Sequence, residues 1–192
     1  MRYRPRGRGL GCPLLLALTL VPALVACDTS FAESRPAALA AFEDEHVAVM
    51  LGFTQCPDVC PTALRQWQRA TRSLSAEELE GFRLVFVTVD PERDTRPVLE
   101  RYVAFFDPAF AALRAEGDEL RELLSALHAY ARKVPSSTPG RYSMDHTASV
   151  FLLDRDGRLV DELRHGTAPD EIARRLRRVL TGSAAEPLLS AR

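Results

Sequence analysis

The sequence has very little lysine and almost no net charge. Its 192 residues include 25 basic and 26 acidic side chains, for a formal net charge of -1, and Lys133 is the single lysine. The arginines are spread along the chain, so no basic face of the kind that binds nucleic acid is indicated. Internal repeats and low-complexity tracts are also lacking. We therefore expect one globular domain with an appendage, and no role in binding nucleic acid.

A long apolar run is missing as well. A membrane-spanning helix usually needs about 20 apolar residues, whereas the N-terminal apolar run extends only from Leu14 to Ala26. It follows a basic stretch that contains Arg2, Arg4, Arg6 and Arg8. A basic region before a short apolar region is typical of a secretory signal. We interpret residues 1–26 as a signal peptide and expect the protein to be exported.

Cys27 ends a segment, Leu24 to Cys27, that resembles the lipobox of bacterial lipoproteins. The resemblance implies that Cys27 is acylated and becomes the first residue of the mature chain. Asp28 resembles the signal that retains such proteins in the inner membrane, which would anchor the domain by lipid on the periplasmic side. Two alternatives stay open: cleavage after Ala32, or an uncleaved signal that anchors the chain.

Cysteine is scarce in the part of the chain that we expect to fold. The chain has four cysteines. Cys12 lies within the signal peptide, and Cys27 is the expected anchor. The folded domain therefore keeps Cys56 and Cys60, which three residues separate. In an oxidising compartment such a pair forms a disulfide, a metal site, or both in alternation.

Apolar runs and turn signals predict an alternating α/β domain over residues 47–181. Residues 27–46 would be the anchor and a tether, either a spacer or a short helix near 36–43, and residues 182–192 a frayed tail. The two leading strands are joined by a helix and should be parallel, whereas the last two should form a hairpin. This order predicts a thioredoxin-like fold, a central mixed sheet with flanking helices. The expected strands are 47–53, 84–89, 148–153 and 158–163, and the expected helices are about 57–73, 96–106, 118–132 and 169–180.

Cys56 and Cys60 should lie where the first strand ends and the first helix begins. A helix N-terminus favours a thiolate, so we expect the pKa of Cys56 to be lowered. Residues four apart on a helix share a face, which would bring the two sulfurs together. Three interpretations stay open: a passive disulfide, the redox-active pair of a reductase, or two ligands of a metal ion. A short disulfide loop stabilises weakly, and reductases usually place two residues between the cysteines.

His146 distinguishes these interpretations. We expect it at a loop-to-strand junction at the same end of the sheet as the cysteines, after a tight loop over 142–145. Two thiolates and an imidazole form a soft donor set that suits Cu(I) or Cu(II), whereas a structural zinc site would need a fourth ligand. Asp90, after the second strand, is a candidate to orient a ligand or a partner. Asp94 or Thr95 is a candidate cap of the next helix.

Three motifs together resemble the SCO/SenC family: Gly52 to Pro61, Val89 to Thr95, and Met144 to Thr147. The resemblance spans about Val47 to Leu180. It implies a thioredoxin-like fold and copper bound by Cys56, Cys60 and His146. It also implies a function in building the binuclear copper centre of cytochrome c oxidase, with the copper-bearing subunit of that oxidase or another copper acceptor as partner.

We therefore expect a copper chaperone, and a thiol-disulfide oxidoreductase of the cell envelope is the alternative. The two activities can coexist, and a sensor of copper or redox state is a third hypothesis. Two features depart from the family pattern. Between Thr29 and His46 there is no Gly-rich turn for the usual N-terminal strand pair, and Phe110 to Asp118 lacks the usual Gly-Thr-Gly-like turn. The shortened N-terminal edge would alter partner docking and leave the ligands intact.

Overall fold

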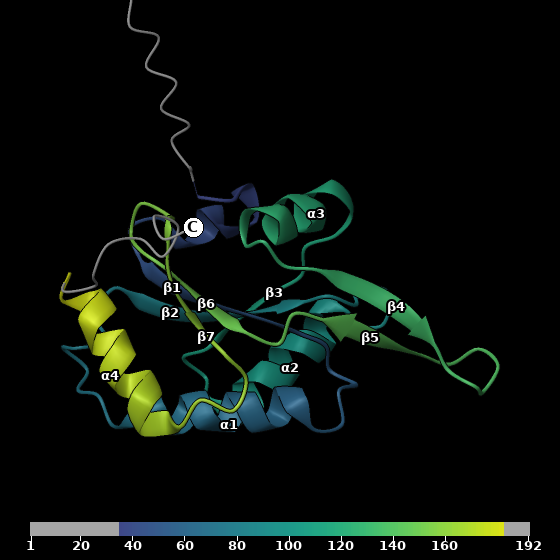
Figure 1. The fold of residues 1–192 in the computed structure, drawn as a ribbon, viewed down its shortest axis with the longest axis horizontal. Helices are drawn as coiled ribbons and strands as arrows, with labels where there is room; N and C mark the ends of the chain where they lie inside the picture. Colours follow the sequence, from purple (N-terminus) through teal and green to yellow (C-terminus); the bar gives the residue numbers. More distant parts are fainter. Residues whose placement is uncertain (1–34, 183–192) are drawn as a thin grey trace, which may run out of the picture. The chain divides into compact units, whose positions relative to one another are not determined.

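Residues 35–182 are the part of the chain that the computed structural model describes (Figure 1). Helices and strands alternate up to the third α-helix, and four successive strands then precede the last helix. The proposed signal peptide and Cys27 lie outside these residues. The strands are β1 (His46–Gly52), β2 (Phe82–Thr88), β3 (Ala111–Leu113), β4 (Ala131–Pro135), β5 (Tyr142–His146), β6 (Val150–Leu153) and β7 (Leu159–Leu163). The helices are the 3-10 helix η1 (Ala37–Phe42) and α1 (Val59–Arg72), α2 (Arg96–Phe106), α3 (Gly117–Ala126) and α4 (Pro169–Leu180).

β1 is the central strand of a five-stranded mixed sheet with the order β3-β2-β1-β6-β7. It pairs with β2 in parallel and with β6 in antiparallel orientation. β6 and β7 form the expected antiparallel hairpin. From Val47 onward every residue of β1 is buried, which explains the continuous apolar run. The predicted thioredoxin-like fold, with a central mixed sheet and flanking helices, is confirmed.

The sheet separates two apolar cores because successive side chains of a strand point to opposite faces. On one face, Ala48 and Met50 of β1 pack with side chains of α1, α2 and α4, among them Trp67, Leu99 and Ile172. On the other face, Val47, Val49 and Leu51 pack with side chains of η1 and α3, among them Leu39 and Leu123. Figure 1 shows η1 and α3 on one side of the sheet and α1 and α4 on the other. The site described below lies where β1 ends between these layers.

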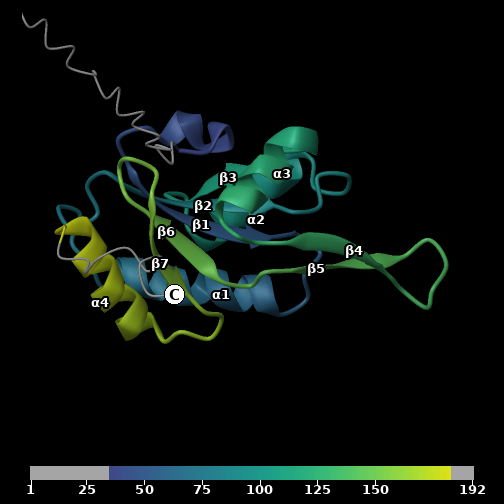
Figure 2. The same cartoon turned by 45° about the horizontal axis from the view of Figure 1, so that its top comes forward.

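The third expected helix is shorter than predicted. Residues 118–132 show helical periodicity, but α3 ends at Ala126 and the chain turns at His128, which has a φ of 50°. Residues 131–135 then form β4, which pairs with β5 in a separate two-stranded sheet. This β4–β5 hairpin extends away from the five-stranded sheet (Figure 2). The hairpin pairs residues 7 to 15 positions apart in the chain, beyond the span of a helical repeat, so helical periodicity alone was a misleading guide to residues 127–132.

Two smaller differences concern the start of α1 and the short strand β3, whereas a short helix before β1 was one of the expected alternatives. α1 begins at Val59 rather than at Pro57, so Cys56 precedes the helix. β3 was not predicted, because three half-buried residues carry too little pattern. The segment before β1 contains the short 3-10 helix, and no strand precedes β1 within residues 35–45. Over residues 35–182 no helix has both the length and the apolar character needed to cross a membrane.

Candidate functional site

The cysteine loop, residues Phe53–Asp58, joins the end of β1 to the start of α1. It turns tightly, and the Cys56 N–H donates to the Phe53 carbonyl at 3.2 Å. Cys60 lies in the first turn of α1 and is 2% exposed, whereas Cys56 is half-buried. The two are free thiols, and the Cys60 backbone N–H donates to Cys56 Sγ at 3.4 Å. The structure therefore brings the two cysteines together, although Cys56 is not itself helical.

The two sulfurs differ sharply in pKa. A hydrogen bond from the Cys60 thiol lowers the pKa of Cys56 to about 5, helped by the N–H groups of Cys60, Asp58 and Val59 and opposed by burial. The same hydrogen bond, together with burial, raises the pKa of Cys60 far above its usual range. The expected lowering for Cys56 is confirmed, but its largest cause is the neighbouring thiol rather than the helix terminus. At neutral pH the pair consists of one thiolate and one thiol.

Gly52 lets the Cys60 sulfur lie directly against the backbone of β1. A Cβ at this position would be 2.5 Å from Phe86 Cζ and 2.9 Å from Cys60 Sγ. Phe86 is fully buried, so its ring has little room to move away. Glycine is required at this position because there is no room for a Cβ atom. The sequence motif alone did not predict this packing.

Asp94 holds the cysteine loop against the end of β2. Its side chain is fully buried and accepts hydrogen bonds from the Thr54 N–H at 3.0 Å, from the Thr54 hydroxyl and from the Thr88 hydroxyl at 2.7 Å. Of the two expected caps of α2, Asp94 is wrong, whereas Thr95 does occupy the N-cap position. The N-cap residue Thr95 makes no side-chain capping bond. The Asp94 carboxylate instead accepts hydrogen bonds from Thr54 and Thr88. Sequence motifs alone could not separate these roles.

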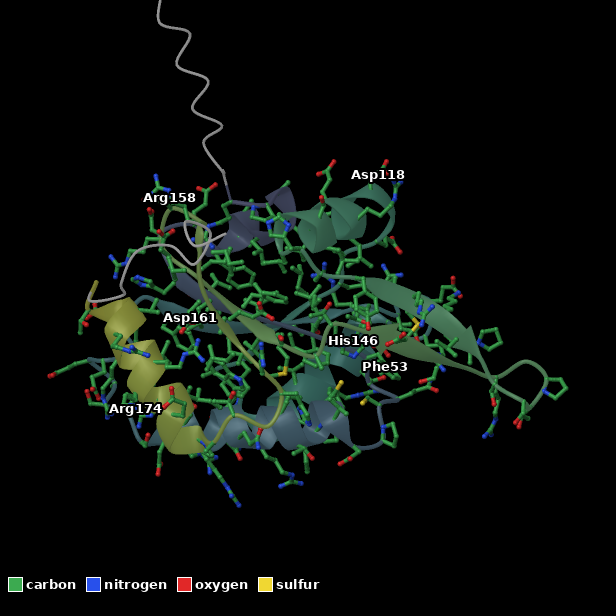
Figure 3. All side chains as sticks on the ribbon, viewed as in Figure 1. Phe53, Asp118, His146, Arg158, Asp161 and Arg174 are labelled. Atoms are coloured by element: carbon green, nitrogen blue, oxygen red, sulfur yellow. The ribbon has the colours of Figure 1, made fainter. Side chains whose placement is uncertain are left out.

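His146 is the last residue of β5 rather than part of a loop. Its Nδ1 lies 2.9 Å from the Thr147 carbonyl oxygen. Because a carbonyl can only accept, Nδ1 of the neutral ring carries the proton and Nε2 is the free donor atom for a metal. The ring meets Phe53 of the cysteine loop edge-on, with centroids 6.0 Å apart (Figure 3). Phe53 thus connects the histidine to the loop that carries Cys56.

The chemical types of the donor atoms in Cys56, Cys60 and His146 match the preference of a soft metal ion. A thiolate, a second sulfur and an imidazole nitrogen held in one tautomer by its neighbour are the donors that copper and other soft ions prefer. Within residues 35–182, however, no three His, Cys, Asp or Glu side chains are gathered closely enough to hold a metal. The assignment of Cys56, Cys60 and His146 as a common ligand set therefore stays a prediction.

Asp90 is almost fully buried, at 1% exposure, in the loop between β2 and α2. It pairs with Arg93 and accepts a hydrogen bond from the Tyr142 hydroxyl at 2.8 Å. Burial and then this hydrogen bond raise the pKa of Tyr142 to about 12, so the hydroxyl remains a donor. Asp90 thus contacts the strand that ends in His146. Arg93 and Tyr142 were not predicted as site residues, because their roles depend on contacts between distant segments.

A family model described as SCO1/SenC matches residues 30–181 of the chain. Among curated proteins, the bovine "Protein SCO2 homolog, mitochondrial" is 32% identical over 138 residues, which are 71% of this chain and 52% of the bovine protein. The chain spans about half the length of the mammalian relatives of this kind that it matches.

Two solved bacterial structures are also similar. Apo Sco1 from Thermus thermophilus is 37% identical, with a TM-score of 0.66 over 72% of this chain and 81% of that chain. ScoI from Bradyrhizobium japonicum, solved with copper bound, is 35% identical, with a TM-score of 0.64 over 72% of this chain and 87% of that chain.

Alkylation should reveal the charge asymmetry of the pair. Because the pKa of Cys56 is lowered to about 5, its reaction with iodoacetamide in the reduced protein should reach half its maximal rate near that pH and level off above it. Cys60 should stay unmodified in the folded protein. In Cys60→Ala the main cause of the shift is gone, so the midpoint should move toward the ordinary thiol value of about 8.5. A wild-type midpoint near 8.5, measured by mass spectrometry of quenched samples, would contradict the thiolate assignment.

Gly52→Ala should destabilise the fold through overlap with Phe86 and Cys60. We expect a loss of about 1–3 kcal/mol in the free energy of unfolding, as is usual when a packed interior receives an extra methyl group. Urea unfolding of the reduced protein measures the loss. In a Phe86→Leu background, which lacks the ring atoms in the overlap, the additional loss caused by Gly52→Ala should be smaller. If the alanine variant is as stable as the wild type, Gly52 does not lie against Phe86 and Cys60 as proposed.

Proposed function

Because the chain belongs to the SCO1/SenC family, we propose that it binds one copper ion through Cys56, Cys60 and His146 and delivers it to another protein. The acceptor would be the copper-bearing subunit of cytochrome c oxidase or another copper protein. The copper-bound ScoI relative, at 35% identity, supports copper as the cargo.

The observation that supports this proposal is that the fold puts two donor atoms, Cys56 Sγ and His146 Nε2, in the state that binds a metal. Cys56 is already a thiolate near neutral pH, because Cys60 and three backbone N–H groups stabilise its charge. The His146 ring is held with Nε2 free, because Nδ1 donates to Thr147. Copper binding would also release the Cys60 proton, since thiolates rather than thiols ligate metals. Three donors leave a position at which a ligand of the acceptor can enter, so transfer can proceed by ligand exchange.

Copper binding has a direct spectroscopic test. The reduced full chain, purified in detergent, should bind Cu(II) in equimolar amount and show a thiolate-to-copper charge-transfer absorption. His146→Ala should abolish that absorption, because one of three ligands is lost. His165→Ala is the matched control, since this exposed histidine lies after β7, outside the site. An unchanged spectrum and stoichiometry in His146→Ala would show that the proposed ligand set is wrong.

A thiol-disulfide oxidoreductase is the second candidate, favoured by the asymmetry of the cysteine pair. The Cys56 thiolate would attack a partner disulfide and release one partner thiolate. The Cys60 thiol would then lose its proton and attack Cys56 Sγ, which releases the second thiolate and leaves a Cys56–Cys60 disulfide. Two electrons pass to the partner, whose disulfide is reduced. Such a reaction would prepare the cysteines of a copper site before metal loading.

The same variants separate the two activities. Reduction of a model disulfide requires both cysteines but no imidazole. His146→Ala should therefore keep a wild-type rate of disulfide reduction while losing the thiolate-to-copper absorption, whereas Cys60→Ala should lose the completed reaction and stall at a mixed disulfide. If wild-type protein fails to reduce disulfides and still binds copper, copper delivery alone remains.

We also propose that the chain is exported and held by lipid on Cys27 at the periplasmic side of the inner membrane. The support is the N-terminal sequence: arginines before a short apolar run that ends in Leu24 to Cys27. Cys27→Ser should abolish incorporation of labelled palmitate into the full chain in growing bacteria, whereas Cys12→Ser should leave it unchanged. Equal labelling of the Cys27→Ser variant would contradict the lipid anchor.

A further inference from the structure

The Arg93 side chain bridges the two segments that carry the proposed ligands. Its Nη1 donates to the Gln55 side-chain oxygen in the cysteine loop at 3.2 Å. The same nitrogen donates to the backbone carbonyl of Tyr142, the first residue of β5, at 3.0 Å. The cysteine loop presents Cys56, and β5 ends in His146. One guanidinium group thus contacts both parts of the site, although it belongs to neither.

Arg93 is itself held on several sides. Its Nε pairs with Asp90, and the other oxygen of that buried carboxylate accepts the Tyr142 hydroxyl. The guanidinium carbon lies 3.8 Å from the centroid of the Tyr142 ring and 5.8 Å from that of Phe53. Nη2 is buried without a hydrogen-bond partner, so this part of the guanidinium group is held only by packing against the rings of Tyr142 and Phe53. Only a planar, forked cation combines stacking with hydrogen bonds in two directions.

The hairpin that carries His146 depends on such contacts. β4 and β5 pair with each other in a sheet of their own and not with the five-stranded sheet. Ala131 and Met144 pack against the core, and Lys133 pairs with Glu92 in the same loop as Arg93. The loop between β2 and α2 therefore contacts the hairpin along its length, at Lys133 in the middle of β4 and at Tyr142 next to the hairpin turn. A strand rises about 3.3 Å per residue, so Tyr142 lies about 13 Å before His146 on one stiff element.

We propose that Arg93 is a positioning residue that sets the placement of His146 relative to Cys56 and Cys60. It fixes Tyr142 at the start of β5, while Phe53 meets the His146 ring at the end of that strand. Asp90 acts through Arg93 and Tyr142, which gives this buried carboxylate a function without direct contact with the metal. The consequence for copper rests on the proposed function, but the effect on the hairpin does not.

Arg93→Lys tests this proposal, since lysine keeps the charge but lacks the planar fork. In the copper-free full chain, amide hydrogen exchange over Tyr142–His146 should become about tenfold faster or more, because charge-assisted hydrogen bonds that hold β5 are lost. Copper affinity should fall by about 10- to 100-fold, as when groups that orient a ligand are removed. In the His146→Ala background the same substitution should change affinity little, because its effect passes through the histidine.

Arg175→Lys is the matched control. Arg175 is 22% exposed, compared with 21% for Arg93, and pairs with Asp161 of β7. Figure 3 shows Asp161 well separated from His146 along the sheet. This variant should change neither the exchange of β5 nor copper affinity. Tyr142→Phe keeps the stacked ring but loses the hydroxyl bond to Asp90, so its effect on both should be smaller than that of Arg93→Lys.

The outcomes separate this proposal from the proposed function. Unchanged β5 exchange in Arg93→Lys would overturn the positioning role, whatever happens to copper. Faster exchange together with a wild-type protein that does not bind copper would support the positioning role and reject the copper function. An equal loss of affinity in the wild-type and His146→Ala backgrounds would also overturn it, because Arg93 would then act on the metal by another route.

Discussion

The buried carboxylate of Asp94 is the contact on which the rest of the site depends. It accepts hydrogen bonds from the Thr54 backbone and hydroxyl and from the Thr88 hydroxyl, which in turn accepts the Asp90 N–H. The cysteine loop, the end of β2 and the loop before α2 are thereby joined in one network. Loss of a shared acceptor would leave several buried donors unsatisfied, so these segments are constrained to move together.

Around this network the two halves of the proposed site are organised differently. The cysteines belong to the core: Cys60 is packed against Gly52 of the central strand, and its thiol holds the charge on Cys56. His146 belongs to a hairpin outside the main sheet and reaches the cysteine loop through Phe53 and Arg93. This difference suits the proposed copper delivery, which requires both binding and release, because one half of the proposed site lies in the packed core and the other is fastened by a few polar contacts.

Local patterns predicted most of the fold because each relevant element carries its own signal. The apolar run of β1, the crossover to β2, the β6–β7 hairpin and the amphipathic face of α4 were recognisable without tertiary information. The hairpin of β4 and β5 was not. Its strands are largely polar and lie outside the core, and residues 127–132 continue the periodicity of α3. Only the pairing with β5, between residues 7 to 15 positions apart, shows that residues 131–135 are a strand.

The sequence by itself determined the chemistry of the site: two cysteines four positions apart, a histidine in a motif of the SCO1/SenC family, and an acidic loop after the second strand. Tertiary structure decided how those groups behave. The low pKa of Cys56 comes from a thiol that folding places beside it. Asp94 accepts a hydrogen bond from a residue 40 positions away in the chain, and Arg93 donates one to a residue 49 positions away. Hydrogen-bond partners at such separations leave no local pattern, because only the packed chain brings them within reach.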